Sequence, residues 1–291
     1  MNSIPQRQNE RQSIDRLKAQ RHTYTIAKRY GVANFICCIV VVLVFALLKL
    51  FFQQEEWLVK SAVCYGAIIT VAKVFITRKQ LGLKKDAARI QQMFDCYLFD
   101  LPWNMALCGK RLEPEDICEA GEGESDDGLA DWYNPKVGSL TPSSATLACM
   151  RINVTYDRKL KQKYLWMVHL VYAAMLLLCI WPVFTDFSFS SVFLKVIVPI
   201  LPLVLYYIDI IHKMRSNIKV LEEINNSIKG GIEKRKNGKD VSTEELAQIQ
   251  DLIFLYRTNS FTIPNWFYNL KRNKMESTID YGIDQLCSEI H

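Results

Sequence analysis

Few residue patterns in this chain could carry out chemistry. The sequence has no HExxH, no GxSxG and no GxGxxG after a predicted strand, the signatures of common metallohydrolase, serine hydrolase and dinucleotide sites. The glycine- and lysine-rich stretch 230–240 lacks the spacing of a phosphate-binding P-loop, and Asp240 replaces the hydroxyl residue that such a loop needs. Asp95 and Asp100 could act as general acid and base, but structural carboxylates are more common. Because the four histidines are also scattered, we predict no catalytic activity, no metal and no cofactor.

Polar residues inside apolar segments form a second group of candidates. A charge at the centre of a bilayer costs about 3 kcal/mol, so such residues often serve a function. The candidates for a pore or gate are His169, Lys195, Pro199, Pro202 and Asp209, the prolines because they would kink a helix and free backbone groups. The alternatives are a snorkelling lysine and a hydrogen-bonded packing histidine. Since the spans hold so few polar residues, we expect any water-filled pore to require a homo-oligomer.

The apolar residues fall into four runs of the length that crosses a bilayer. Half of the 291 residues are hydrophobic, and strongly charged segments separate the runs. Each run is close to the about 20 residues that a transmembrane helix needs. The predicted spans are 33–52, 57–77, 164–184 and 191–211. The first span follows a polar segment and is too long for a signal peptide, so we expect it to be retained. The sequence therefore predicts a mainly α, multi-pass membrane protein with four transmembrane helices in two hairpins, 33–77 and 164–211.

The positions of lysine and arginine predict the orientation of these spans. Residues 1–32 carry seven basic residues and two acidic ones, and further basic clusters follow the second span, precede the third and follow the fourth. The short loops 53–56 and 185–190 contain no basic residue. Basic residues accumulate on the cytoplasmic side of membrane proteins. We therefore predict a bacterial inner-membrane protein with both termini and segment 78–163 in the cytoplasm, and we attribute the net charge of +6 to topology rather than to binding of a nucleic-acid polymer.

The middle cytoplasmic segment, 78–163, is long enough for a small α+β insertion. It begins with a helix that continues from the second span, and the alternation at 94–99 predicts a short strand that Pro102 ends. Pro114 is typical of a first helical position. Residues 119–131 are acidic and contain three glycines, which predicts a mobile loop. From about residue 143 a helix is expected to run into the third span.

The two terminal cytoplasmic segments are predicted to be helical. Residues 1–32 contain a partial apolar stripe, typical of an amphipathic helix near a membrane. Segment 212–291 has helical periodicity, with breaks predicted at 230–231 and 237–238. Ser242 and Glu245 form a capping box that opens a helix to about Arg257, and a last helix is expected from near Pro264.

Several motifs occur together, in order, along nearly the whole chain. They are Ile4-Pro5-Gln6-Arg7-Gln8-Asn9, Phe94-Asp95, Leu101-Pro102-Trp103-Asn104, Asp131-Trp132-Tyr133, Cys149 with Asn153 and Asp157, and Ile263-Pro264-Asn265-Trp266-Phe267-Tyr268. This set resembles the SMODS-associated four-transmembrane effectors of bacterial cyclic-oligonucleotide antiphage systems (CBASS). Met150 stands where the family pattern has a glutamine. The resemblance implies a pore-forming effector that permeabilises the inner membrane and stops growth, after a CD-NTase-type nucleotidyltransferase has made a nucleotide second messenger.

A cyclic oligonucleotide offers flat bases and anionic phosphates, so its cytoplasmic site should combine aromatic side chains with arginine or lysine. Trp103, Trp132, Tyr133, Arg151 and Arg158 fit this description in one region, although Trp103 and Trp132 could instead form the domain core. Two other functions stay open. An ion channel or transporter unrelated to immunity would show a dense polar stripe in the spans, and a membrane-anchored enzyme would need catalytic motifs in 78–163.

Overall fold

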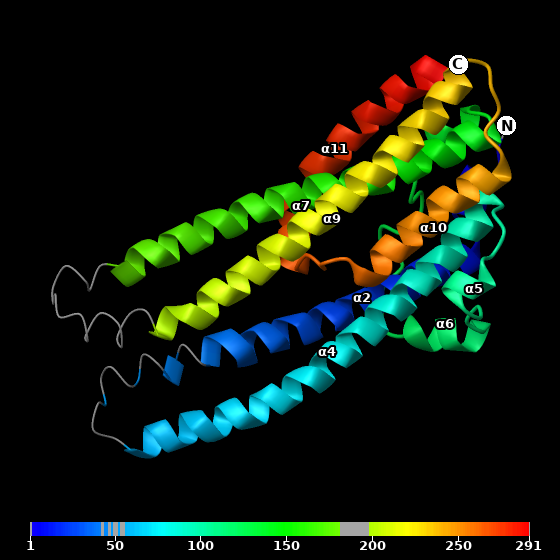
Figure 1. Cartoon of the computed structure of the whole chain (residues 1–291). Coiled ribbons are helices and arrows are strands. Elements are labelled where there is room, and N and C mark those ends of the chain that lie inside the picture. The colour runs from blue at the N-terminus through cyan, green and yellow to red at the C-terminus, as the bar shows by residue number, and fades with distance from the viewer. Residues whose placement is uncertain are drawn as a thin grey trace. The chain divides into compact units, whose positions relative to one another are not determined.

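Helices make up the regular structure of this chain (Figure 1). The structure is a computed structural model, and it describes residues 2–41, 44–45, 48, 52, 56–180 and 198–290. These ranges contain no strand, so the mainly α fold class is confirmed and the α+β character predicted for the insertion is wrong within the described residues. The elements are α1 (Ile4–Arg7), α2 (Arg11–Phe35), the π-helical turn η1 (Ile36–Val40), α4 (Glu56–Phe99), α5 (Met105–Cys108), α6 (Pro114–Ala120), the 3-10 turn η2 (Pro135–Ser139), α7 (Pro142–Ile180), α9 (Val198–Lys236), α10 (Thr243–Asn259) and α11 (Asn265–Ile290).

The chain divides into two compact units. Unit 1 comprises Met1–Ala27, Leu81–Lys161 and Asn217–His291, and unit 2 comprises Lys28–Gln80 and Gln162–Ser216. Every boundary between them falls inside a long helix, so α2, α4, α7 and α9 each contribute residues to both units.

Unit 1 is built around the C-terminal part of α4. Phe94, Cys96 and Leu98 of this helix belong to the largest core cluster, together with apolar side chains from α2, α7, α9, α10 and α11. In Figure 1, α10 runs beside this part of α4, and the Gln250 side chain of α10 donates a hydrogen bond to Gln92 of α4 over 2.8 Å.

The strand predicted at 94–99 is the last turns of α4 instead. Helical packing buries nearly every side of this stretch, and that hides the helical period in the sequence. The helix ends because Asp100 adopts a left-handed conformation, with φ of 55°. The Leu101 amide then donates to the Cys96 carbonyl over 3.0 Å, which is the pattern of a Schellman helix end.

Three predicted helix signals are confirmed. Pro114 occupies the first turn of α6. The Ser242 hydroxyl accepts a hydrogen bond from the Glu245 amide, and the Glu245 carboxylate accepts one from the Ser242 amide, both over 3.2 Å, so the capping box opens α10. The helix expected from residue 143 is α7, which runs unbroken from Pro142 to Ile180.

The helix break predicted at Gly230-Gly231 is wrong, because α9 continues through both residues to Lys236. Gly231 is buried, and a Cβ atom there would lie 3.0 Å from a methyl carbon of Leu147 in α7. This glycine therefore allows two helices to approach closely. The break expected at 237–238 does occur, with Gly238 at φ of 70°.

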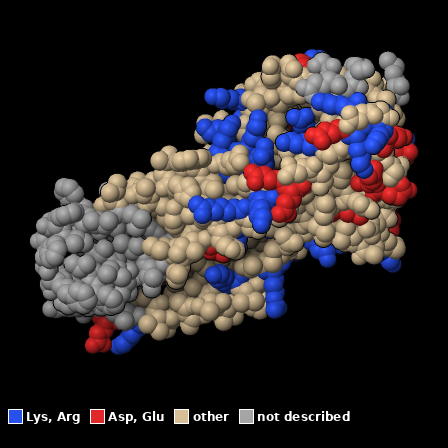
Figure 2. All heavy atoms as spheres, turned by 45° about the horizontal axis from the view of Figure 1, so that its top comes forward, with Lys and Arg blue, Asp and Glu red and all other residues tan. Residues whose placement is uncertain are grey.

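Unit 2 exposes apolar side chains along its helices. Val63 and Ile68 of α4 are 68% and 69% exposed, and Leu177 of α7 is 72% exposed. On the face shown in Figure 2, the surface beside the residues drawn in grey carries few charged side chains. A soluble unit rarely leaves so many large apolar groups in water.

One helix in the described ranges, α4, contains a stretch long and apolar enough to cross a membrane, and none of that stretch is buried. The helix α4 contains the predicted span 57–77. The other predicted spans, 33–52, 164–184 and 191–211, each include residues outside the described ranges.

The two adjacent glycines of α9 offer a matched test of helix packing. Nothing lies within 4 Å of a Cβ built at exposed Gly230, so Gly230→Ala should stabilise the protein by about 0.5–1 kcal/mol through helix propensity. Gly231→Val should destabilise it by about 1–3 kcal/mol, because the new side chain meets Leu147. Thermal unfolding of the purified protein measures both, and equal stability of the two variants would contradict the close approach of α7 and α9.

Candidate functional site

A buried ion pair lies at the centre of unit 1. The Asp95 side chain of α4 is 1% exposed, and Nη1 of Arg257 in α10 lies 2.5 Å from its Oδ2. Gln250, two turns before Arg257, donates to the same oxygen over 3.0 Å. Burial has the largest single effect on the pKa of Arg257 and lowers it, but the charge of Asp95, its hydrogen bond and the nearby Tyr24 and Tyr133 together raise the pKa above its ordinary value. The Arg257 guanidinium therefore stays charged in the core, where it depends on Asp95 as its partner.

Tyr133 extends this pair into a network across four further contacts. Its hydroxyl donates to Asp95 Oδ1 over 3.3 Å and accepts from Asn153 of α7 over 2.6 Å. The Gln8 side chain accepts from the Tyr133 amide over 2.9 Å and donates to the Tyr133 carbonyl over 3.1 Å. The network thus joins the N-terminal segment, α4, the loop before η2, α7 and α10.

Two smaller polar contacts flank the network. Asp157 of α7 accepts hydrogen bonds from Tyr256 over 2.5 Å and from Lys161 over 2.7 Å. Asn9 and Asp131 form a reciprocal pair, in which the Asn9 amide donates to the Asp131 carboxylate over 2.8 Å and the Asp131 backbone donates to Asn9 over 2.9 Å.

The motif residues of the sequence therefore meet in space. Gln8, Asp95 and Asn153 come from three separate motifs, and each forms a hydrogen bond with Tyr133 of a fourth. Their side chains are shielded from water or partly so, which suits a structural network rather than a catalytic site. This explains why the four motifs occur together in one chain.

Sequence reasoning missed Arg257 and Gln250 as members of this network. A signal was present, because both fall on the buried stripe of α10 at helical spacing. The stripe is Leu246, Ile249, Gln250, Ile253, Phe254 and Arg257. An arginine on an otherwise apolar helix face requires a buried acid on a neighbouring element.

Two of the five candidate ligand residues are engaged in the fold. Tyr133 is 1% exposed, so its proposed role as a stacking surface needs correction: its ring lies in the core against Phe99, and burial raises the pKa of its hydroxyl well above the ordinary value. The indole nitrogen of Trp103 donates to the Gly109 carbonyl over 2.9 Å, and Arg111 lies over its ring.

The other three candidates keep part of their surface in contact with water. Trp132 packs against the core cluster but is half-buried. Arg151 and Arg158 lie two turns apart on α7, and Arg158 forms an ion pair with Glu222 of α9 at 3.5 Å. The Nε atom of Arg158 is buried without a hydrogen-bond partner among the described residues.

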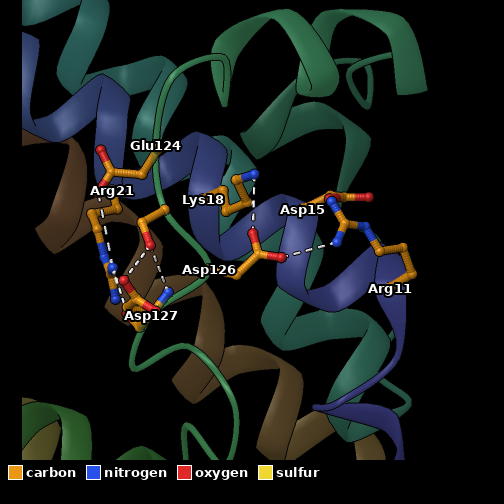
Figure 3. Close-up of polar contacts among 8 residues, drawn as sticks. Arg11, Asp15, Lys18, Arg21, Glu124, Asp126 and Asp127 are labelled. Atoms are coloured by element: carbon orange, nitrogen blue, oxygen red, sulfur yellow. Dashed lines mark hydrogen bonds and ion pairs between the residues drawn. The ribbon is translucent and has the colours of Figure 1, made fainter.

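The acidic loop that was predicted to be mobile lies on α2, as Figure 3 shows. Asp126 pairs with both Arg11 and Lys18 at 3.0 Å, and Arg21 lies 3.8 Å from Glu124. Acidic side chains of this loop therefore pair with basic side chains of α2, a contact that composition alone did not indicate.

The candidate pore and gate residues lie in unit 2 or outside the described residues. Nδ1 of His169 lies 2.7 Å from the hydroxyl of Tyr207, which supports the packing alternative. Asp209 forms an ion pair with Lys213 one turn later at 2.7 Å. Pro199 and Pro202 belong to the first two turns of α9, and Lys195 lies outside the described residues.

Unit 1 also has a shallow groove of about 630 Å³ between α1, η2 and α11. Apolar atoms form most of its surface, with Pro5, Pro135 and Gly138 among the lining residues. An ion pair between Lys136 and Asp284, at 2.7 Å, lies on its wall.

The comparisons with known proteins agree with one another. The profile of the SMODS-associating 4TM effector domain matches residues 2–286. A protein of Bacillus cereus (strain VD146), named as a probable CBASS effector molecule, is 26% identical over 279 residues, which cover 92% of this chain and 93% of that protein. No solved structure gives a significant match.

The buried ion pair generates a stability prediction. Asp95→Asn leaves Arg257 charged and unpaired in the core, so it should destabilise the protein by about 3–5 kcal/mol. Asp100→Asn is the matched control, because that carboxylate is 91% exposed and its ion pair with Arg7 should contribute at most about 1 kcal/mol.

Thermal unfolding in detergent measures both variants. Replacing both partners, as in Asp95→Leu with Arg257→Met, should recover much of the loss, since no buried charge remains. An Asp95→Asn protein as stable as the Asp100→Asn protein would contradict the buried pair.

Proposed function

Because the chain belongs to the SMODS-associating 4TM effector family, we propose that it is the membrane effector of a bacterial CBASS antiphage system and acts by permeabilising the inner membrane. The name of the Bacillus cereus relative supports the assignment to CBASS. In this proposal a CD-NTase-type nucleotidyltransferase makes a cyclic oligonucleotide, which binds the effector and opens it. The effector itself performs no covalent chemistry.

The observation that carries the proposal is the contrast between the two units. Unit 2 exposes large apolar side chains on long helices, such as Val63, Phe75 and Leu170, which a bilayer would cover. Unit 1 buries an apolar core that encloses the Asp95 network, and it has charged surfaces suited to the cytoplasm. The four-span arrangement in two hairpins, with both termini cytoplasmic, fits this contrast and the distribution of basic residues.

Activation can be explained by the long helices. Since every unit boundary falls inside α2, α4, α7 or α9, a ligand that changes how these helices pack in unit 1 acts on helices whose residues also belong to unit 2. Moving an equilibrium from 1:99 to 99:1 requires about 5.5 kcal/mol of differential binding. One charge-assisted phosphate contact gives about 1.5–3 kcal/mol and each stacked base about 1–3 kcal/mol. A few contacts therefore suffice.

Pore formation in this proposal requires several copies. Among the described residues of unit 2, His169 contacts Tyr207 and Asp209 contacts Lys213, so neither side chain is left free to line a water-filled path by itself. A homo-oligomer could build such a path from one polar helix face of each subunit. Trp103, Trp132, Arg151 and Arg158 remain candidates for contacting the messenger, because they are partly exposed.

Topology gives the first functional prediction. Reporter fusions at residues 10, 120 and 285 should all behave as cytoplasmic, because basic residues flank the spans on that side only. A fusion in the loop 185–190 serves as the opposite control and should report the periplasm. One periplasmic signal from the first three fusions would contradict the arrangement in two hairpins.

Co-expression of the protein with the cognate cyclase gives the second functional prediction. The cells should depolarise, as read by a potential-sensitive dye, and a catalytically inactive cyclase should leave the potential intact. Trp132→Ala and Arg151→Ala should abolish this response without lowering the amount of protein in the membrane. Growth arrest with an intact potential and degraded nucleic acid would instead favour a membrane-anchored enzyme.

A further inference from the structure

Three basic side chains line one face of α2. Arg11, Lys18 and Arg21 are separated by seven and three residues, a spacing that places them on the same side of a helix. Asp15, one turn after Arg11, lies 2.8 Å from its second terminal nitrogen and so orients that guanidinium. Figure 3 shows all three cations directed at the loop that follows α6.

The loop places its anionic atoms at two positions on this face. At the first, Asp126 bridges two cations, with Oδ2 at 3.0 Å from Arg11 Nη1 and Oδ1 at 3.0 Å from Lys18 Nζ. At the second, Arg21 donates to the backbone carbonyls of Asp127 over 3.0 Å and Gly128 over 3.5 Å. The nearest carboxylate to Arg21, that of Glu124, is 3.8 Å away. Arg21 thus lacks the bidentate partner that a guanidinium binds best.

The loop is fixed at both ends and held by charge between them. Gly121 is buried, and a Cβ there would lie 3.3 Å from the Ala19 amide nitrogen. Leu129 is fully buried in the core cluster. Between these anchors only Glu124 is half-buried and the other side chains are exposed. Because exposed ion pairs are weak, the middle of the loop can leave α2 while its ends stay in place.

We propose that the α2 face of Arg11, Lys18 and Arg21 is a binding site for a ligand with two phosphate groups, and that residues 122–128 cover it in the resting protein as an internal competitor. A bridging phosphate would replace the carboxylate of Asp126, and a second would give Arg21 a bidentate partner. The proposal rests on the proposed function for the source of the ligand. A phosphodiester could come from a soluble cyclic oligonucleotide or from an anionic lipid headgroup, and the test separates the two.

The position of the loop connects this site to the core of unit 1. After Leu129 the chain passes directly to Asp131, which pairs with Asn9, and to Tyr133, which pairs with Gln8 and contacts Asp95. Leu129, which stays in the core, therefore separates the part of the loop that can leave α2 from the segment that carries Tyr133.

The test compares variants that should change ligand affinity in opposite directions, and it uses the purified full chain in detergent. The combined change Glu124→Gln and Asp126→Asn removes the competitor, and should tighten binding of cyclic di-AMP or inorganic pyrophosphate about tenfold. The combined change Arg11→Gln and Lys18→Gln removes the site, and should weaken binding at least about tenfold. Asp127→Asn is the control, because it removes one negative charge from the same loop, and among the described residues its carboxylate accepts a hydrogen bond from Ser125 and forms no ion pair with the three cations. It should change affinity less than about twofold.

The rate of backbone hydrogen exchange distinguishes a competitor loop from a purely structural loop, because ligand binding should change this rate only if the loop is displaced. Binding of either soluble probe to the wild-type protein should speed exchange of the backbone amides of residues 123–128. Slower exchange on binding would mean that the loop closes over the ligand. This result would contradict the proposal that residues 122–128 compete with the ligand for α2. Acidic and basic variants that change affinity in the same direction, or that match Asp127→Asn, would overturn the site.

Vesicles distinguish the two sources of phosphate. If the same changes in affinity appear with phosphatidylglycerol-containing vesicles and not with the soluble probes, the ligand is a lipid headgroup; the reverse identifies a soluble nucleotide. If the variants change binding of neither the soluble probes nor the vesicles, the proposed phosphate site is wrong. This result would not bear on the proposal that the protein permeabilises the membrane. Binding with the expected signs but no leakage of the vesicles would refute the proposed function and leave the site standing.

Discussion

The buried pair of Asp95 and Arg257 is the constraint on which unit 1 depends. Two opposite charges in a core cost several kcal/mol each to remove from water, and they are tolerated only when every remaining polar atom finds a partner. Here Gln250 and Tyr133 complete the coordination of the carboxylate, and Gln8 and Asn153 in turn fix Tyr133. Five segments that lie far apart in the sequence must therefore be in register before the pair is satisfied. Gln8, Asp95, Tyr133 and Asn153 of this network belong to the motifs that carry the resemblance, whereas Gln250 and Arg257 do not.

The sequence predicted what depends on local signals. The proline that starts α6, the capping box at Ser242 and the unbroken α7 all follow from a few neighbouring residues. The strand at 94–99 failed because a helix buried on nearly all sides loses its 3.6-residue period, and only Asp100 and Leu101 mark its end. Gly231 looked like a helix breaker, but its role is the contact with Leu147, which no local pattern shows. The partner of Asp95 lies 162 residues away in sequence, beyond any pattern of spacing.

The functional residues divide in the same way. Tyr133 was a reasonable stacking candidate by type, yet its hydroxyl and backbone are all engaged in the core. The acidic loop suggested mobility by composition, whereas its charges meet Arg11, Lys18 and Arg21 across more than 100 residues of sequence. Electrostatic pairing between distant segments is the part of this structure that single-sequence reasoning could not supply. It also links the surface of α2 to the buried network, because Asp131 and Tyr133 directly follow the loop.

The most direct measurement of the account is reconstitution of the purified full chain into vesicles loaded with a small fluorescent dye. Addition of the cyclic oligonucleotide made by the cognate cyclase should release the dye from vesicles that contain the protein, and from no vesicles that lack it. Release should require the messenger, and neither the messenger nor the lipid should be chemically altered. Intact vesicles together with consumption of the messenger, or with cleavage of an added nucleic acid, would contradict the assignment of a membrane-permeabilising effector.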